Sequence, residues 1–181
     1  MKKLCSILFA ALIPLLTPSL ATSHGYAPLL QLVRQATAKY RYVQNALDAG
    51  YEPGACVSGR DEGAMGIHFV KGALLGDGMV NAATPEALIY EPMPHGGLRL
   101  VGVEYITFVA DWDRENPPPP MGGPVPATLE GHLFHYSGSP NRYGIPPFYE
   151  LHVWAWKHNP NGTFSDWNPN VSCHGQPLTS S

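Results

Sequence analysis

An amphipathic segment near the start of the chain sets the strongest constraint on the fold. From Pro28 to Ala49, apolar residues recur at alternating spacings of four and three, which is the period of one helix face. Pro28 suits the first turn of a helix, and Gly50 suits the position after the last turn. One helix cannot bury such a stripe by itself, and the later segments favour strands, so the helix must pack on a sheet. The stripe consists of Leu29, Val33, Ala36, Tyr40, Val43 and Leu47.

Four later segments carry strand signals. Leu98 to Val109 is the longest, and it is rich in β-branched and aromatic residues. Strict alternation places Glu104 on the same face as Leu100 and Ile106, where a carboxylate needs a partner. Residues 92–97 indicate a hairpin turn before this strand. The other expected strands are residues 65–70, 88–91 and 148–159.

Glycine and proline number 19 each, and only 14% of residues are charged, which is typical of a loop-rich chain. Residues 51–66 predict a long loop, and Thr84 predicts the start of a brief helix. Residues 117–126 predict a surface segment that covers a pocket, and residues 128–136 fit either a strand or a helical turn. The predicted fold class is α+β: an N-terminal amphipathic helix packed on an antiparallel sheet that can curl into a partial barrel, with long Pro/Gly-rich loops and one disulfide.

Residues 1–21 have the features of a secretory signal peptide. A positively charged start precedes an apolar run from Leu4 to Leu16, and the small residues Ser19 and Ala21 match the positions that a signal peptidase reads. The run is too short to be a permanent membrane span, and no later run is longer. We therefore expect an exported single domain, residues 22–181, in the periplasm or the extracellular medium, with no membrane span in the mature chain.

Two cysteines remain after removal of the signal, Cys56 and Cys173. In an exported protein they most simply form a disulfide. The bridge would close most of the mature chain into one loop, worth roughly 4–5 kcal/mol in the loop-entropy model. Two free thiols or two metal ligands are the alternatives.

The charge of the chain bears on its partners. Loss of the two lysines of the signal takes the formal net charge from −3 to −5. This acidic balance argues against nucleic acid or an anionic membrane as a partner. A small molecule or a metal ion is the predicted partner.

The segment 148–159, FYELHVWAWKHN, contains the most informative strand pattern. Read as one strand, it places a carboxylate, two imidazoles and two indoles on a single face. Such a mixture is unusual for a core and typical of a binding site. The face consists of Glu150, His152, Trp154, Trp156 and His158.

Three polar residues lie in the middle of predicted strands: His68, Glu104 and His152. If the strands are neighbours, these residues can bind one transition metal (zinc, copper, iron or manganese) and leave positions open to water. Glu150 is a second-layer partner or alternative ligand. His132 and His135 are further alternative ligands.

Other interpretations of the same residues stay open. The protein can be a non-catalytic module that binds a small apolar or aromatic ligand, with Trp154 and Trp156 as pocket wall. The polar residues can also form purely structural networks. Signal cleavage after Ser23 would make His24 the N-terminus, and an N-terminal histidine can chelate copper, as in lytic polysaccharide monooxygenases. Those enzymes begin with a strand, whereas here a helix follows.

Several segments together resemble a widespread family of exported bacterial proteins. They are GAMGIHFV (63–70), PEALIYEP (85–92), LRLVGVEY (98–105) and LHVWAWKHNPNGTFSDWNPNVSC (151–173). The helix segment ATAKYRYVQNALDAGY (36–51) is similar too. The resemblance covers nearly all of the mature chain. It implies one exported domain and brings no assigned activity, substrate or metal.

Overall fold

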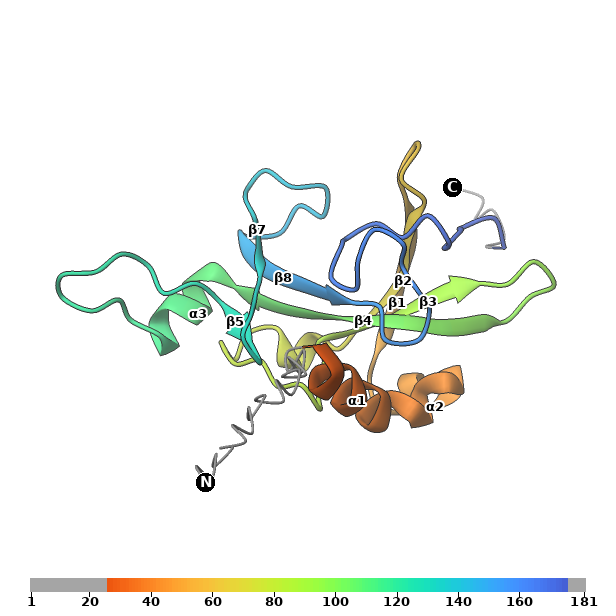
Figure 1. Ribbon diagram of the computed structural model, residues 1–181, viewed down its shortest axis with the longest axis horizontal. Coiled ribbons are helices and arrows are strands. Elements are labelled where there is room, and N and C mark those ends of the chain that lie inside the picture. Colours follow the sequence, from red (N-terminus) through yellow and green to blue (C-terminus); the bar gives the residue numbers. More distant parts are fainter. Residues whose placement is uncertain (1–25, 176–181) are drawn as a thin grey trace, which may run out of the picture.

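The computed structural model describes residues 26–175 and shows helices packed on a curled antiparallel sheet (Figure 1). The predicted signal peptide and His24 lie outside the described residues. Six strands form the sheet in the order β1-β2-β3-β4-β8-β7, with antiparallel neighbours throughout. The predicted α+β class with an antiparallel sheet is confirmed. The strands are β1 (Glu52–Ser58), β2 (Ala64–Val70), β3 (Ala87–Pro92), β4 (Leu98–Phe108), β7 (His135–Ser137) and β8 (Phe148–Val153).

The N-terminal helical region covers one face of the sheet, but it is not the single helix predicted. Tyr42 interrupts it with an extended backbone, φ −93° and ψ 109°. The interruption shifts the phase of the buried stripe, so Ala46 is fully buried while Leu47 is 41% exposed. The three pieces are α1 (Tyr26–Thr37), the 3-10 helix η1 (Ala38–Arg41) and α2 (Val43–Asp48).

Gly50 ends α2 at the expected position. Its φ of +84° is a left-handed conformation that glycine adopts without strain. The N–H of Gly50 donates to the Leu47 carbonyl, and the N–H of Tyr51 donates to the Ala46 carbonyl. This pair of hydrogen bonds satisfies two carbonyls at the helix end and turns the chain toward β1.

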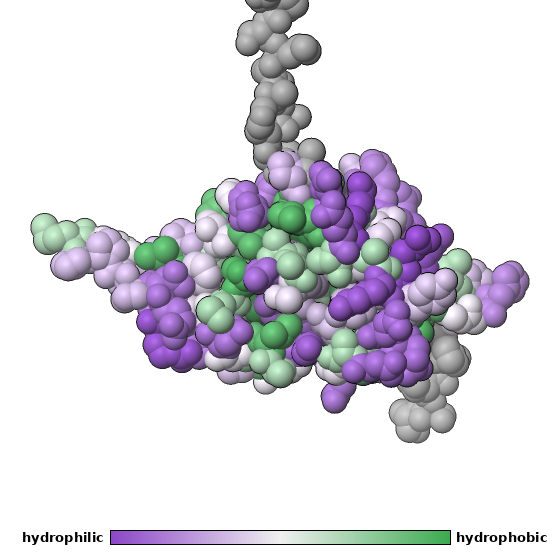
Figure 2. Space-filling view, turned by 90° about the horizontal axis from the view of Figure 1, so that it is seen from below, coloured by the Kyte–Doolittle hydropathy of each residue, from purple (hydrophilic) through white to green (hydrophobic). Residues whose placement is uncertain are grey.

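The main hydrophobic core lies between the helices and the sheet. The Tyr90 hydroxyl donates to the Tyr40 carbonyl, and Arg34 donates from Nε to the Ala155 carbonyl at 2.6 Å. These bonds join η1 and α1 to the sheet and to the segment after β8. Seen from the helix side of the molecule, hydrophobic residues lie among hydrophilic ones across the middle of the surface (Figure 2). The core includes Leu29, Val33, Ala46, Ile67, Phe69, Leu88, Tyr90, Leu100, Val103, Tyr105, Leu151 and Val153.

A bulge in β4 decides which face each of its residues takes. Ile89 pairs with Gly102 but Tyr90 pairs with Leu100, so Val101 is an extra residue on β4. Leu100 therefore faces the helices, while Glu104 faces the other way. Strict alternation had placed Leu100 and Glu104 on one face, and that prediction is wrong because it cannot register a bulge.

The segment after β8 covers part of the sheet face opposite the helices (Figure 1). Ala64 and Asn168 exchange backbone hydrogen bonds of 3.2 Å. Cys173, near the end of this segment, forms the predicted disulfide with Cys56 of β1, which is confirmed. A second buried cluster forms beneath the segment from Ala64, Ile89, Val101, Trp154 and Val171.

Strand β8 ends at Val153, so the predicted strand through residue 159 is wrong beyond that point. The N–H groups of Trp156 and Lys157 both donate to the Val101 carbonyl, at 3.1 and 3.0 Å. The carbonyl of the extra residue in the β4 bulge thus binds the chain just after β8, and the chain bends there. The N–H of Trp154 donates instead to Thr163, which brings the following turn back over the sheet.

The predicted loop 51–66 contains β1, which the glycine and proline content concealed. Both residues are tolerated there because β1 is an edge strand with a register shift between Pro53 and Cys56. Thr84 closes a turn with Asn81 and begins no helix.

Short elements make up the rest of the described chain. Residues 128–136, expected as a strand or a helical turn, form β5 (Thr128–Leu129), β6 (His132–Leu133) and the first part of β7. Besides β1, the sequence did not predict the 3-10 helix η2 (Gly72–Leu74) and the helix α3 (Val109–Glu115). Within residues 26–175, no helix is long and apolar enough to span a membrane.

The Cys56–Cys173 disulfide spans 117 residues of sequence, so it restricts most of the unfolded chain. We expect the double variant Cys56→Ser/Cys173→Ser to lose about 4–5 kcal/mol of unfolding free energy in the loop-entropy model. Urea denaturation of the oxidised protein and the double variant measures this loss. Equal midpoints and slopes would show that the bridge adds no stability.

Buried Glu86 makes stability depend on pH. Burial is the main cause that raises the pKa of Glu86 from 4.5 to about 8, and the Ile106 N–H donates to its carboxyl at 3.1 Å. The folded state therefore holds a proton that the unfolded state releases near pH 4.5. Stability contributed by this proton is lost as pH rises from about 4.5 to about 8, with a slope of at most about 1.4 kcal/mol per pH unit.

The variant Glu86→Gln keeps the acceptor for Ile106 but cannot ionise. We expect it to gain stability relative to the unsubstituted protein at each step from pH 5 to pH 8. Denaturation of both proteins at four pH values gives the difference, in which all other titrating groups cancel. Parallel stability curves would contradict the role given to Glu86.

Candidate metal centre

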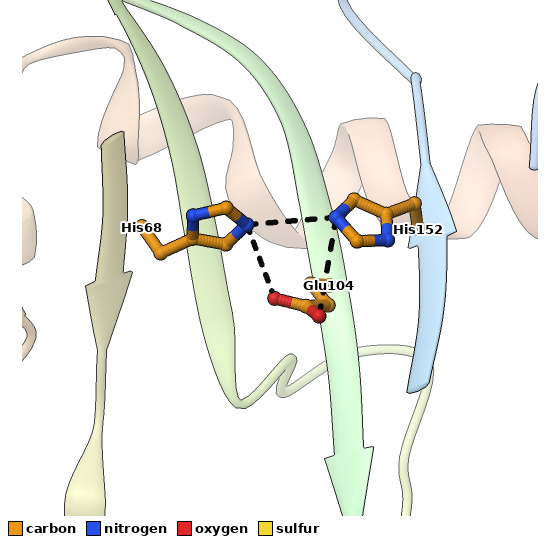
Figure 3. Close-up of side chains that lie close together, drawn as sticks. All are labelled: His68, Glu104 and His152. Atoms are coloured by element: carbon orange, nitrogen blue, oxygen red, sulfur yellow. Dashed lines mark hydrogen bonds and ion pairs between the residues drawn. The ribbon is translucent and has the colours of Figure 1, made fainter. Parts of the chain in front are cut away.

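Three side chains from three strands converge on the sheet face opposite the helices (Figure 3). His68 Nε2 lies 3.3 Å from Glu104 Oε2 and 3.5 Å from His152 Nε2. His152 Nε2 lies 3.9 Å from Glu104 Oε1. One ligand atom from each residue lies within 4.8 Å of the other two. Among residues 26–175, this is the one group of three or more His, Cys, Asp or Glu residues positioned to hold a metal ion.

Strand register explains how these residues meet. Glu104 pairs directly with His152 across β4 and β8. His68 lies on β2, two strands from β4, with β3 between them. Neighbouring strands are about 4.8 Å apart, so His68 and Glu104 must reach across β3. The residue opposite Glu104 on β3 is Ala87, whose small side chain leaves that space open.

The group is buried, and burial sets its protonation. His152 is 0% exposed, Glu104 4% and His68 8%. Burial and then the neighbouring His152 lower the pKa of His68 to about 3, so this imidazole is neutral at pH 7. Its contact with Glu104 at pH 7 is therefore not an ion pair. Burial and then the nearby Glu150 carboxyl raise the pKa of Glu104 well above its usual range.

Two further carboxylates, Glu150 and Asp166, lie beside the group of His68, Glu104 and His152. Glu150 lies two residues before His152 on β8 and is buried, and its Oε2 has no hydrogen-bond partner. Asp166 Oδ1 lies 3.4 Å from His152 Nδ1 and 3.0 Å from His135 Nδ1. Burial acts to raise the pKa of Asp166, but the neighbouring His152 and His135 rings outweigh it and lower the pKa. Asp166 thus lies beside Nδ1 of the His152 ring without a hydrogen bond to it, while Nε2 of that ring faces Glu104.

Sequence reasoning did not find Asp166. It lies in an irregular segment that returns to the sheet through the Asn159–Gly162 turn, where no periodicity predicts direction. The sequence signal that could have indicated Asp166 is its position. It is an acidic residue that follows the first turn after β8, the strand that carries buried His152.

The remaining sequence candidates lie outside the group of three. His135 is an exposed residue of β7 that contacts Asp166, and the His132 ring packs on Phe164 with centroids 4.2 Å apart. Trp154 stacks near His152, with centroids 6.3 Å apart. The two tryptophans do not share a face, because the strand has ended: the Trp156 indole packs on the helix side and donates to Thr37.

A cavity of about 450 Å³ opens beside the group, and His68 and Glu104 line it. Its walls come from β1, β2, β4, the start of β8 and the β7–β8 loop, residues 138–147. Trp154 and Trp156 line a different cavity, next to α1. The proline-rich segment 117–126 contributes no lining residue and extends away from the body of the protein (Figure 1). Trp154 and Trp156 therefore line a cavity, as predicted, but not the one beside the group, and the proline-rich segment does not cover that one.

Comparison with known proteins found no family model, no curated protein and no solved structure that matches this chain. The resemblance described from the sequence segments stays a prediction.

Glu150 brings a second carboxyl close to buried Glu104. We expect Glu150→Gln to raise the unfolding free energy of the protein in chelator by about 1 kcal/mol, because it removes crowding between buried carboxyls. Urea denaturation in EDTA at pH 7 measures the change. Glu52→Gln, on the exposed edge strand β1, is the matched control and should leave stability unchanged. Destabilisation by Glu150→Gln would instead indicate that its charge is needed.

Proposed function

We propose that this protein binds one transition-metal ion through His68, Glu104 and His152, and that the ion is retained for chemistry on a small molecule. The observation that carries the proposal is the convergence of two imidazole nitrogens and one carboxylate from three separate strands. Imidazole and carboxylate are ligands that zinc, copper, iron and manganese share.

The spacing of the ligand atoms supports this proposal. Bonds of about 2.0–2.1 Å meeting at a tetrahedral angle place ligand atoms about 3.4 Å apart. The His68–His152 separation is 3.5 Å, and the His68–Glu104 separation is 3.3 Å. A cation would also offset the cost of holding Glu104 ionised and buried. The contact of Asp166 with His152 Nδ1 matches the second-layer carboxylate that commonly orients a metal-binding histidine.

Burial favours metal-dependent catalysis over metal handling. An ion that is passed between proteins needs ligands near the surface, whereas all three residues are buried here. The cavity reaches His68 and Glu104, so a small molecule can approach positions that protein ligands leave open. The ion would supply positive charge there, and Asp166 would keep the His152 ring in place.

An exported location is consistent with the Cys56–Cys173 disulfide, because such bridges persist in oxidising compartments. Secretion by way of residues 1–21 is part of this proposal. N-terminal sequencing of protein secreted by its own host tests it, and a retained Met1 would contradict it.

Calorimetric titration of chelator-treated protein with zinc, copper(II), iron(II) and manganese(II) tests the metal site. We expect one ion per chain, with copper(II) and zinc bound more tightly than manganese(II). His152→Ala and Glu104→Gln should each weaken zinc binding by about a hundredfold or more, since each removes a ligand. Glu104→Gln preserves side-chain shape, so it separates loss of a ligand from loss of packing.

His95→Ala is the matched control, because His95 is exposed in the turn between β3 and β4. It should bind zinc as the unsubstituted protein does. Circular dichroism confirms that each variant is folded before titration. Equal zinc binding by folded Glu104→Gln, His152→Ala and the unsubstituted protein would overturn the proposed site.

A further inference from the structure

The cavity beside the metal centre has an apolar interior. Most of its walls are aliphatic or aromatic, and the polar groups His68 and Glu104 belong to the metal centre on one side. Burying apolar surface against such walls is favourable, whereas a polar ligand body would lose hydrogen bonds to water there. The cavity therefore suits a ligand with an apolar body. The apolar walls are Ala55, Val57, Val70, Leu75, Ile106, Ile145 and Phe148.

One cation lies on the cavity wall. Arg142 is exposed, and within the described residues its guanidinium makes no ion pair or hydrogen bond with a carboxylate. It lies instead over the Trp167 ring, at 5.2 Å from the centroid. In this position its N–H donors remain available to a ligand. Those donors match a carboxylate, which accepts two parallel hydrogen bonds from a guanidinium.

The loop that carries Arg142 is held in place before any ligand binds. The Asn141 side chain donates to the carbonyls of Gly138 and Ile145, at 2.9 and 2.8 Å. Its Oδ1 accepts from the N–H groups of Tyr143 and Ile145, at 3.1 and 3.3 Å. A fixed loop lowers the entropy lost on binding, so the charge of Arg142 and the apolar Ile145 are presented together.

We propose that the cavity binds a small apolar monocarboxylate, whose carboxylate pairs with Arg142 and whose apolar body lies against Ile106, Ile145 and Phe148. The body would extend toward His68 and Glu104, next to the metal. The substrate class of the centre is then an aliphatic or aromatic acid that presents its apolar part to the ion. This step builds on the proposed metal site, but its recognition elements are separate from the metal ligands.

Size limits the ligand. A cavity of about 150 Å³ accommodates benzene, so 450 Å³ accommodates a body of roughly ten to eighteen non-hydrogen atoms. A medium-chain fatty acid or an arylalkanoic acid falls in this range. An amine of the same shape would meet Arg142 with like charge, and a neutral alcohol would gain only the apolar contacts.

The test compares three probes with one apolar body: octanoate, 1-octanol and octylammonium. Calorimetric titration is done on the zinc-loaded and on the metal-free protein. We expect octanoate to bind about tenfold or more tightly than 1-octanol, because charged hydrogen bonds contribute at this level, and octylammonium to bind most weakly. The preference for octanoate should appear in both forms of the protein.

Two variants separate the contribution of the ligand's carboxylate to binding from the contribution of its apolar body. Arg142→Gln should weaken octanoate by about tenfold or more and leave 1-octanol nearly unchanged. Ala55→Trp, on the exposed edge strand β1, should fill part of the cavity and weaken both probes while zinc still binds. Arg41→Gln is the matched control, since Arg41 also lies over a tryptophan, Trp156, but on the helix side.

The outcomes distinguish this proposal from the metal proposal. Loss of octanoate binding in Arg142→Gln and retention in Arg41→Gln would support it, whether or not zinc binds. Octanoate binding that needs zinc and ignores Arg142→Gln would overturn it, because the carboxylate would then bind the ion. Equal binding of octanoate, 1-octanol and octylammonium, or no binding of any, would also overturn it.

Discussion

The bulge at Val101 positions both the candidate site and the C-terminal segment. It reverses the alternation along β4, so Leu100 can join Val103 and Tyr105 in the core under the helices while Glu104 points to the opposite face. The Val101 carbonyl also accepts hydrogen bonds from Trp156 and Lys157, which ends β8 and bends the chain back. One extra residue thus positions the carboxylate and directs the C-terminal segment that covers the sheet.

The two faces of the sheet differ in the side chains that they bury. The helix side buries a continuous apolar core, and the Tyr90–Tyr40 hydrogen bond attaches the helical region to β3. The other side holds polar groups that would be costly without partners. Some of these groups contact one another, whereas Glu150 Oε2 and His152 Nδ1 have no hydrogen-bond partner. In the proposed metal site a cation would offset that cost, and the apolar core on the other side supplies stability that can tolerate it.

The proposed metal centre and the proposed acid site share one cavity but use different elements. The proposed metal ligands come from the interior strands β2, β4 and β8, where backbone pairing on both sides holds side chains rigidly. Arg142 and Ile145 come from the β7–β8 loop, which the Asn141 side chain fixes. Substitutions in the β7–β8 loop would therefore alter ligand preference without disturbing the proposed metal ligands on β2, β4 and β8.

Sequence patterns were enough to predict the helix-on-sheet class, the pairing of Cys56 with Cys173, and the three residues of the candidate site. Those inferences rest on periodicity, cysteine count and the rarity of mid-strand polar groups, which are local properties. Tertiary structure decided the break at Tyr42, the end of β8, the contact of Asp166 with His152 and the position of Arg142 beside the cavity. A bulge, an edge strand and a returning loop create these features through contacts between distant segments, and no single-segment pattern records such contacts.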